Sequence, residues 1–151
     1  MRDVDARNAL RREALKRHEG DADTLVLHEP GLRHGVACVA VANGSLHGYE
    51  IKSASDTLDR LPAQIEIYGS GLDRAILIVG QRHADKAINI VPPWWGVKIA
   101  TEGPHDRIQL RDERRPRTNT TIDSLAVAEL LWSTAAKEVL RDLEYAEKDL
   151  A

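Results

Sequence analysis

Phenylalanine is absent from this 151-residue chain, and aromatic residues make up only 4% of it. Its core must therefore be built mainly from leucine, isoleucine, valine and alanine. A single cysteine excludes an internal disulfide, which favours a reducing compartment. No apolar run resembles a signal peptide or reaches the roughly 18 residues of a membrane span. These absences predict one cytoplasmic domain with no membrane partner.

A strong excess of charge is lacking as well, because the formal net charge is −3. A protein that coats nucleic acid indiscriminately would be basic over its whole surface, so the balance excludes that class but permits a local basic groove. The six histidines are scattered, and neither H-E-x-x-H nor C-x-x-C occurs, so no zinc spacing is present.

The hydrophobic pattern predicts an α/β chain with a mixed sheet. Residues 5–18 have helical spacing, residues 24–28 and 36–42 are of strand length, and Asn43–Gly44 is a hairpin signal before a returning strand at 46–53. The further predicted elements are a helix from Pro62 to about residue 72, a strand at 74–80, a helix at 83–91, strands at 96–100 and 107–111, and a long C-terminal helix at 122–147. The core order is helix, three strands, helix, strand.

The sequence YEIKS in the returning strand places two opposite charges on one face. Glu50 and Lys52 project together because residues i and i+2 of a strand share a face. Burying such charges is costly without partners, so they are either an ion pair at the margin of the sheet or a functional pair. The next helix adds Gln64 and Tyr68, which share a face because they lie four residues apart.

This succession resembles the PD-(D/E)XK nuclease superfamily, in particular its RecB-like branch with a Q-x-x-x-Y helix. YEIKS, QIEIY and AILIVG occur in the family's order. From about residue 24 onward, the chain is also similar to a group of small, poorly characterised bacterial nuclease-like proteins, through NGSLHGYEIKSASDTL, LPAQ, VPPWWG and AELLWS. VPPWWG is specific, whereas E-x-K alone is not. The resemblance implies one restriction-endonuclease-like α/β domain over residues 1–151.

The resemblance also implies a chemistry. A hard divalent ion held by carboxylates activates a water molecule and neutralises charge on the phosphate. Glu50 would be a ligand of Mg²⁺ or Mn²⁺, Lys52 the base or electrostatic stabiliser, and Gln64 an accessory catalytic residue. Tyr68 would support the site or contact a nucleic-acid phosphate. The expected function is metal-dependent hydrolysis of DNA in a bacterial or phage setting.

One position departs from the family's pattern. The metal-binding Asp should lie on the strand before the hairpin, where this chain has Cys38, and a thiol is a poor ligand for Mg²⁺. A three-residue or bulged loop would place Cys38 on the face of Glu50, whereas a two-residue turn would not, so we predict the longer loop. Cys38 is an engineered replacement, or the mark of a degenerate nuclease, or Glu29 completes the metal site instead. Taken alone, Cys38 also fits a small buried hydrophobe.

Two further clusters are candidates for contacts with partners. Arg111, Arg114, Arg115 and Arg117 are suited to a phosphate backbone, although the acids among them also fit a solvated surface. The pair Trp94–Trp95 fits either stacking on bases or anchoring a loop in the core or at an interface. Two alternatives to a DNA nuclease therefore stay open: an impaired nuclease fold that binds nucleic acid or a partner protein, and an assembly subunit such as a homodimer.

Overall fold

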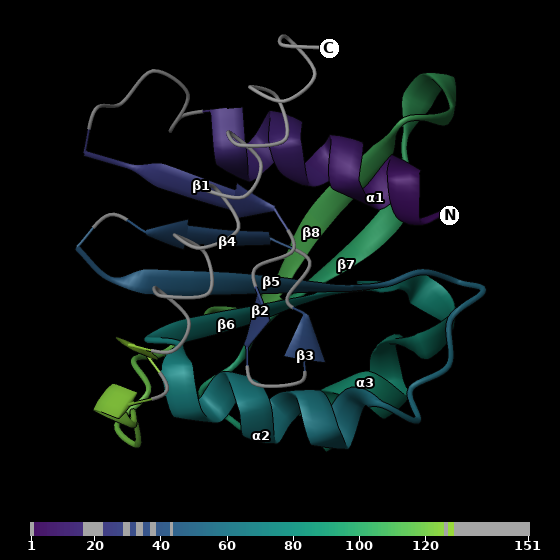
Figure 1. Ribbon diagram of the computed structural model, residues 1–151. Helices are drawn as coiled ribbons and strands as arrows, with labels where there is room; N and C mark the ends of the chain where they lie inside the picture. Colours follow the sequence, from purple (N-terminus) through teal and green to yellow (C-terminus); the bar gives the residue numbers. More distant parts are fainter. Residues whose placement is uncertain are drawn as a thin grey trace, which may run out of the picture.

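The structure is a computed structural model that describes residues 2–16, 23–28, 31–32, 35–36, 39–42, 44–125 and 127–128 (Figure 1). The helices are α1 (Asp3–Leu10), the π-helix η1 (Arg11–Leu15), α2 (Leu61–Gly71), the 3₁₀-helix η3 (Gln81–His83), α3 (Ala84–Ile90) and the 3₁₀-helix η4 (Pro104–Asp106). The strands are β1 (Leu25–His28), β2 (Gly31–Leu32), β3 (Gly35–Val36), β4 (Val39–Ala42), β5 (Leu46–Lys52), β6 (Arg74–Gly80), β7 (Gly96–Glu102) and β8 (Ile108–Arg114).

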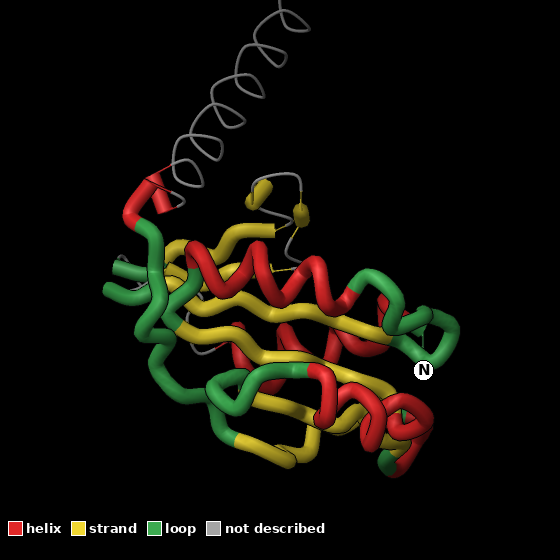
Figure 2. The backbone as a smooth tube through the Cα atoms, turned by 90° about the horizontal axis from the view of Figure 1, so that it is seen from below, coloured by secondary structure: helices red, strands yellow, loops and turns green. Residues whose placement is uncertain are grey.

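Six strands lie side by side in one mixed sheet, in the order β1-β4-β5-β6-β7-β8 (Figure 2). β1 pairs with β4, β4 with β5 and β7 with β8 in antiparallel fashion, whereas β5, β6 and β7 are parallel. Apart from the small β2–β3 ribbon, the chain runs helix, three strands, helix, strand up to β6. The predicted fold class, a mixed α/β sheet flanked by helices, is therefore confirmed.

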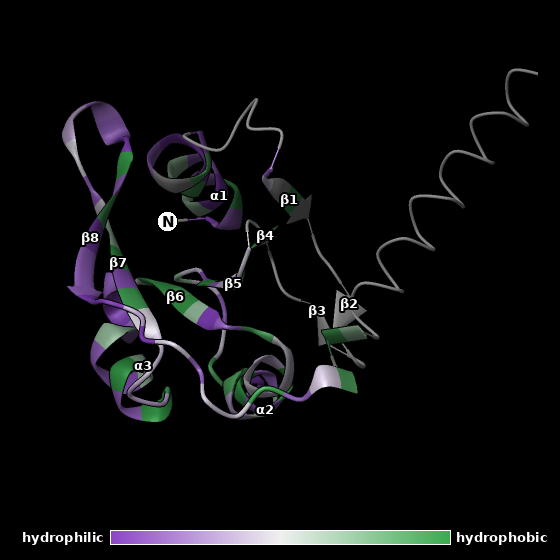
Figure 3. Ribbon diagram, turned by 90° about the vertical axis from the view of Figure 1, so that its left-hand side faces the viewer, coloured by the Kyte–Doolittle hydropathy of each residue, from purple (hydrophilic) through white to green (hydrophobic). Residues whose placement is uncertain are grey.

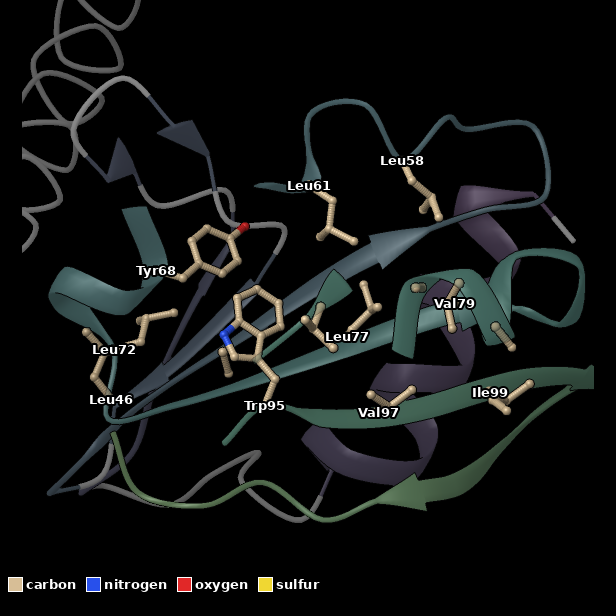
Figure 4. Close-up of a cluster of buried hydrophobic side chains, with 14 residues drawn as sticks. Leu46, Leu58, Leu61, Tyr68, Leu72, Leu77, Val79, Trp95, Val97 and Ile99 are labelled. Carbon is tan, nitrogen blue, oxygen red and sulfur yellow. The ribbon is translucent and has the colours of Figure 1, made fainter. Parts of the chain in front are cut away.

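Helices cover both faces of the sheet, with α1 on one side and α2 and α3 on the other (Figure 3). The alternation of β5 assigns its side chains to the two layers. Tyr49 and Ile51 belong to the apolar cluster beneath α1, and Leu46 belongs to the cluster beneath α2 and α3. β6 is buried from Ala75 to Gly80 because a central parallel strand has helices on both faces. Figure 4 shows the cluster beneath α2 and α3.

The hairpin between β4 and β5 has the predicted loop length. Ala42 pairs with Leu46, so three residues connect the strands, and Gly44 within the loop has a φ of 90°. This left-handed conformation is open to glycine at no steric cost. The pairing of Val39 with Tyr49 keeps the same register at the other end of β4.

The described residues of the predicted strand at 36–42 belong to two different sheets, and residues 37 and 38 lie outside the described part of the chain. Val36 pairs with Gly31 in the separate ribbon, and Val39–Ala42 form β4 of the main sheet. An apolar run does not reveal where a chain changes its pairing partner. Most of the predicted helix at 122–147 lies outside the described residues. Leu125, near the start of that predicted helix, is 62% exposed.

Candidate functional site

The charged residues of β5 form a buried ion pair in the middle of the sheet. The Nζ atom of Lys52 lies 3.0 Å from Oε1 of Glu50, and the side chains are only 4% and 3% exposed. Both project towards α2, because their neighbours Tyr49 and Ile51 pack beneath α1. The pair is therefore not a surface feature at the margin of the sheet, which was one of the two explanations open from sequence.

Helix α2 brings the predicted amide and phenol to the same carboxylate. Nε2 of Gln64 donates a hydrogen bond to Oε1 of Glu50 at 2.8 Å, and the hydroxyl of Tyr68 donates to Oε2. Gln64 and Tyr68 share a face of the helix, which starts at Leu61 with a proline in its first turn. The four residues Glu50, Lys52, Gln64 and Tyr68 are called the acid–base cluster below.

Tyr68 is entirely buried, which favours support of the site, the first of its two expected roles, over contact with a nucleic acid. Its ring stacks on that of Trp95, with centroids 5.5 Å apart and an angle of 5° between the planes. Figure 4 shows the two rings facing one another above the strands. The stack holds the plane of the tyrosine ring, and the hydroxyl of that ring donates to Glu50. Tyr68 therefore positions the carboxylate.

Trp95 is in turn held by the strand at the edge of the sheet. Nε of Arg114 donates to the carbonyl of Trp95 at 2.8 Å, and Nη2 donates to the carbonyl of Pro92 at 3.0 Å. Burial, and then the nearby charge of Arg117, lowers the pKa of the Arg114 guanidinium. The sequence left two interpretations of the tryptophans in VPPWWG open, stacking on bases or anchoring of the loop. Trp95 is buried and anchors this segment in the core.

A contact that sequence reasoning missed secures the end of α2. The side chain of Asn119, only 5% exposed, donates to the carbonyls of Gly69 at 2.7 Å and Leu72 at 2.9 Å. The last carbonyls of a helix lack partners within the helix, and the amide supplies them. The sequence had no signal for this role, since Asn119 lies in a polar stretch far from α2.

Within the acid–base cluster, Lys52, Gln64 and Tyr68 all contact the carboxylate of Glu50. Burial of an ion pair is costly unless further hydrogen bonds compensate for the loss of water, and Gln64 and Tyr68 supply such bonds. Oε1 of Gln64, by contrast, is buried and has no hydrogen-bond partner among the described residues. A buried acceptor of this kind beside a carboxylate is available to a water molecule or a cation.

The described residues supply only part of a metal site. Glu50 and the spare oxygen of Gln64 are hard ligands of the kind that Mg²⁺ prefers, and in that respect they fit. However, no group of three or more His, Cys, Asp or Glu side chains that could hold a metal ion occurs among the residues the structure covers. The two other predicted ligand positions, Cys38 and Glu29, lie outside the described residues.

The structure separates the four predicted arginines. Arg114 is the structural anchor described above, and Nη1 of Arg111 lies 2.9 Å from Oε2 of Glu113 on β8. Arg115 and Arg117 are exposed in the segment after β8. The backbone N–H of Arg117 donates to the carbonyl of Trp94 at 2.8 Å, which holds that segment against the tryptophan loop. These arginines therefore do not form one uniform surface.

Together these features define a mixed α/β protein with a buried acid–base cluster on the central strand of its sheet. The chain belongs to the family described as Bacteriophage P4 protein cII, which it matches over residues 7–151. Within the described residues, no helix has the length and apolar character to cross a membrane.

Two individual proteins are similar to this chain. One is Protein cII of Enterobacteria phage P4, which is 24% identical over 104 residues, or 69% of this chain and 39% of that protein. The chain thus spans about two fifths of the length of this relative. The other is a solved structure, the SPO1766 protein of unknown function from Silicibacter pomeroyi, with a TM-score of 0.59 and 16% identity, covering 95% of this chain and 90% of the other. At this identity the likeness concerns the fold.

Proposed function

We propose that this protein is a divalent-metal-dependent nuclease that hydrolyses phosphodiester bonds in DNA, with a PD-(D/E)XK-type site at the acid–base cluster. One observation carries the proposal: Lys52, Gln64 and Tyr68 all meet Glu50. The residues come from a central strand and from the helix that follows it, the two elements that carry the corresponding motifs in the nucleases this chain resembles.

Each residue has a role that follows from its contacts. Glu50 would hold Mg²⁺ or Mn²⁺, with the spare oxygen of Gln64 close by; when bound, the ion would neutralise phosphate charge and lower the pKa of a water molecule. Lys52 has one ion-pair partner among the described residues, so its other N–H donors can stabilise negative charge on a phosphate oxygen. Tyr68 is a positioning residue, because it acts through Glu50.

The experiment is a plasmid-nicking assay with Mg²⁺ and with Mn²⁺. We expect the wild-type protein to nick DNA, and Lys52→Ala and Glu50→Gln to lose at least about 100-fold in rate, because each removes a group that stabilises charge in the transition state. Lys98→Ala is the matched control, since Lys98 pairs with Asp112 at the exposed edge of the sheet. Nicking that persists in Lys52→Ala would assign the activity to a contaminant, and absence of nicking by the wild type would refute the proposal.

The residue at position 38 offers a second test of the metal site. If the strand before the hairpin carries a ligand position, Cys38→Asp replaces a soft ligand by a hard one. Isothermal titration should then detect tighter binding of Mn²⁺, and the nicking rate should rise. Unchanged affinity and unchanged rate in this variant would remove position 38 from the proposed site.

A degenerate nuclease fold that binds nucleic acid without cutting it is the second candidate. It is favoured by the engagement of both oxygens of Glu50 with protein donors and by the single carboxylate of the acid–base cluster. Binding of DNA that weakens with added salt, in a protein without nicking activity under either metal, would support this candidate over the first.

A further inference from the structure

Two adjoining hollows lie at the carboxyl ends of the parallel strands β5, β6 and β7. We propose that they seat the phosphate backbone of a nucleic-acid strand, with Arg82 and Lys86 contacting phosphates. This inference rests on the proposed function, because it names where the substrate of the acid–base cluster lies. In open α/β sheets, the edge formed by the carboxyl ends of the strands is the usual place for a ligand.

The hollows meet at one arginine. The first has a volume of about 310 Å³ and lies between the loop after β5 and the residues Arg82, His83 and Lys86. The second, of about 320 Å³, lies at the ends of β6 and β7. Ala54 and Arg82 line both, so Arg82 stands where a nucleic-acid strand crossing from one hollow to the other would pass.

The donors in the first hollow lack protein acceptors. The side chains of Arg82 and Lys86 are exposed and form no hydrogen bond or ion pair with another described residue. Nε2 of His83 is buried and has no hydrogen-bond partner within the described part of the chain. A buried donor or acceptor without a partner is costly, so it indicates a missing ligand or water.

The acidic residues of the same hollow do not cancel these charges equally. Oδ2 of Asp56 accepts hydrogen bonds from the N–H of Ser53 at 2.7 Å and from its hydroxyl at 2.8 Å. Its charge is therefore directed into the turn after β5. Asp59 remains as the opposing charge at the rim. In the first hollow, two permanent cations and an imidazole thus face one unengaged carboxylate, and Glu102 lines the second hollow. The excess of positive charge in the first hollow suits phosphodiesters, which carry one negative charge each.

The hollows also lie next to the acid–base cluster. Lys52 is the last residue of β5, and the wall of the first hollow begins two residues later at Ala54. On the neighbouring strand, Val79 pairs with Lys52, and Gly80 lines the second hollow. A nucleic-acid strand whose phosphates contact Arg82 and Lys86 would therefore pass the end of β5, the strand that carries Glu50 and Lys52.

The test is binding of a fluorescein-labelled single-stranded oligonucleotide by the full chain, measured by anisotropy over a range of salt concentrations with EDTA present. In Arg82→Ala/Lys86→Ala, we expect affinity to fall at least tenfold and the slope of log K against log salt to fall by about 1.4, since each phosphate contact on single strands contributes about 0.7. Arg82→Lys/Lys86→Arg should keep the slope. Arg111→Ala/Arg115→Ala removes the same amount of charge from the other candidate phosphate surface, at β8, and should change the slope little if the nucleic acid lies in the hollows.

An unchanged slope and affinity in Arg82→Ala/Lys86→Ala would overturn the inference, as would a wild-type chain that binds no oligonucleotide at low salt. Loss of binding in Arg111→Ala/Arg115→Ala alone would place the nucleic acid at β8 and would also overturn the inference. The nicking assay separates this inference from the proposed function. Binding through the hollows without nicking would refute only the nuclease, whereas nicking with an unchanged KM in Arg82→Ala/Lys86→Ala would refute only the hollows.

Discussion

Removing one charge of the Glu50–Lys52 pair should destabilise the protein far more than removing both. The two side chains are 3% and 4% exposed, and the charged atoms lie 3.0 Å apart. Breaking a buried ion pair from one side costs about 3–5 kcal/mol, because the remaining charge is left without its counterion. In Lys52→Met, Gln64 and Tyr68 still donate to the carboxylate, so we expect the lower end, about 3 kcal/mol.

The neutral double variant completes the cycle. Glu50→Gln alone leaves a buried ammonium and should also cost about 3 kcal/mol, whereas Glu50→Gln/Lys52→Met leaves no charge and should cost about 1–2 kcal/mol. The coupling energy between the two sites is then about 4–5 kcal/mol, because the double variant costs less than the singles added together.

Urea denaturation followed by tryptophan fluorescence measures these free energies, with the midpoint and slope fitted separately. A loss of about 3 kcal/mol corresponds to a fall in Tm of about 6–12 °C for a chain of this size. Lys98→Met/Asp112→Asn is the control cycle; the pair is much more exposed and should show a coupling energy below about 1 kcal/mol. Losses for Glu50 and Lys52 that add to within about 0.5 kcal/mol would refute the reasoning.

Other substitutions test the surroundings of the cluster, all by urea denaturation. Arg114→Ala removes two donors to partly buried carbonyls and should cost about 2 kcal/mol, against less than about 0.5 kcal/mol for Arg111→Ala; equal losses would contradict the anchoring role. Gly69→Ala should stabilise α2 by about 0.5–1 kcal/mol, because the added Cβ would meet nothing within 4 Å. Gly96→Ala should cost about 1–3 kcal/mol, because its Cβ would lie 2.8 Å from a proline ring. A loss for Gly69→Ala and a gain for Gly96→Ala would be inconsistent with this packing. Burial alone would raise the pKa of Asp56, but the hydrogen bonds from the serine at the start of its turn hold that pKa below its usual value. The carboxylate therefore stabilises the fold above about pH 4 and less as the pH falls, so the difference between wild type and Asp56→Asn should shrink in acid; a constant difference would contradict this.

The acid–base cluster could be predicted because its members are close in sequence and follow local periodicities. Alternation along a strand places Glu50 and Lys52 together, and helical spacing places Gln64 and Tyr68 together. Only the docking of α2 on the sheet is then needed to join the two pairs, and the apolar residues of that helix require it. The central strands were predicted for a similar reason, since buried parallel strands are continuous apolar runs.

The supports of the cluster could not be predicted in the same way. Trp95 stacks on Tyr68, Arg114 holds Trp95 through its backbone carbonyl, and Asn119 holds the end of α2, all from positions far along the chain. No periodicity connects such residues with their targets. The arginines illustrate the difficulty, because charge in the sequence did not distinguish the half-buried anchor Arg114 from its exposed neighbours Arg115 and Arg117.

The amide of Asn119 that closes α2 has a consequence for the order in which the protein matures. A ribosome releases Glu50 and Tyr68 well before Trp95, and Trp95 before Asn119, and nascent domains fold as their parts emerge. Until Asn119 has been synthesised, the carbonyls at the end of α2 lack the amide that binds them. Until Trp95 has been synthesised, the ring of Tyr68 lacks the ring on which it stacks. Nascent chains released short of residue 119 should therefore hold the carboxylate loosely, and its firm positioning should appear only after residue 119 has been synthesised.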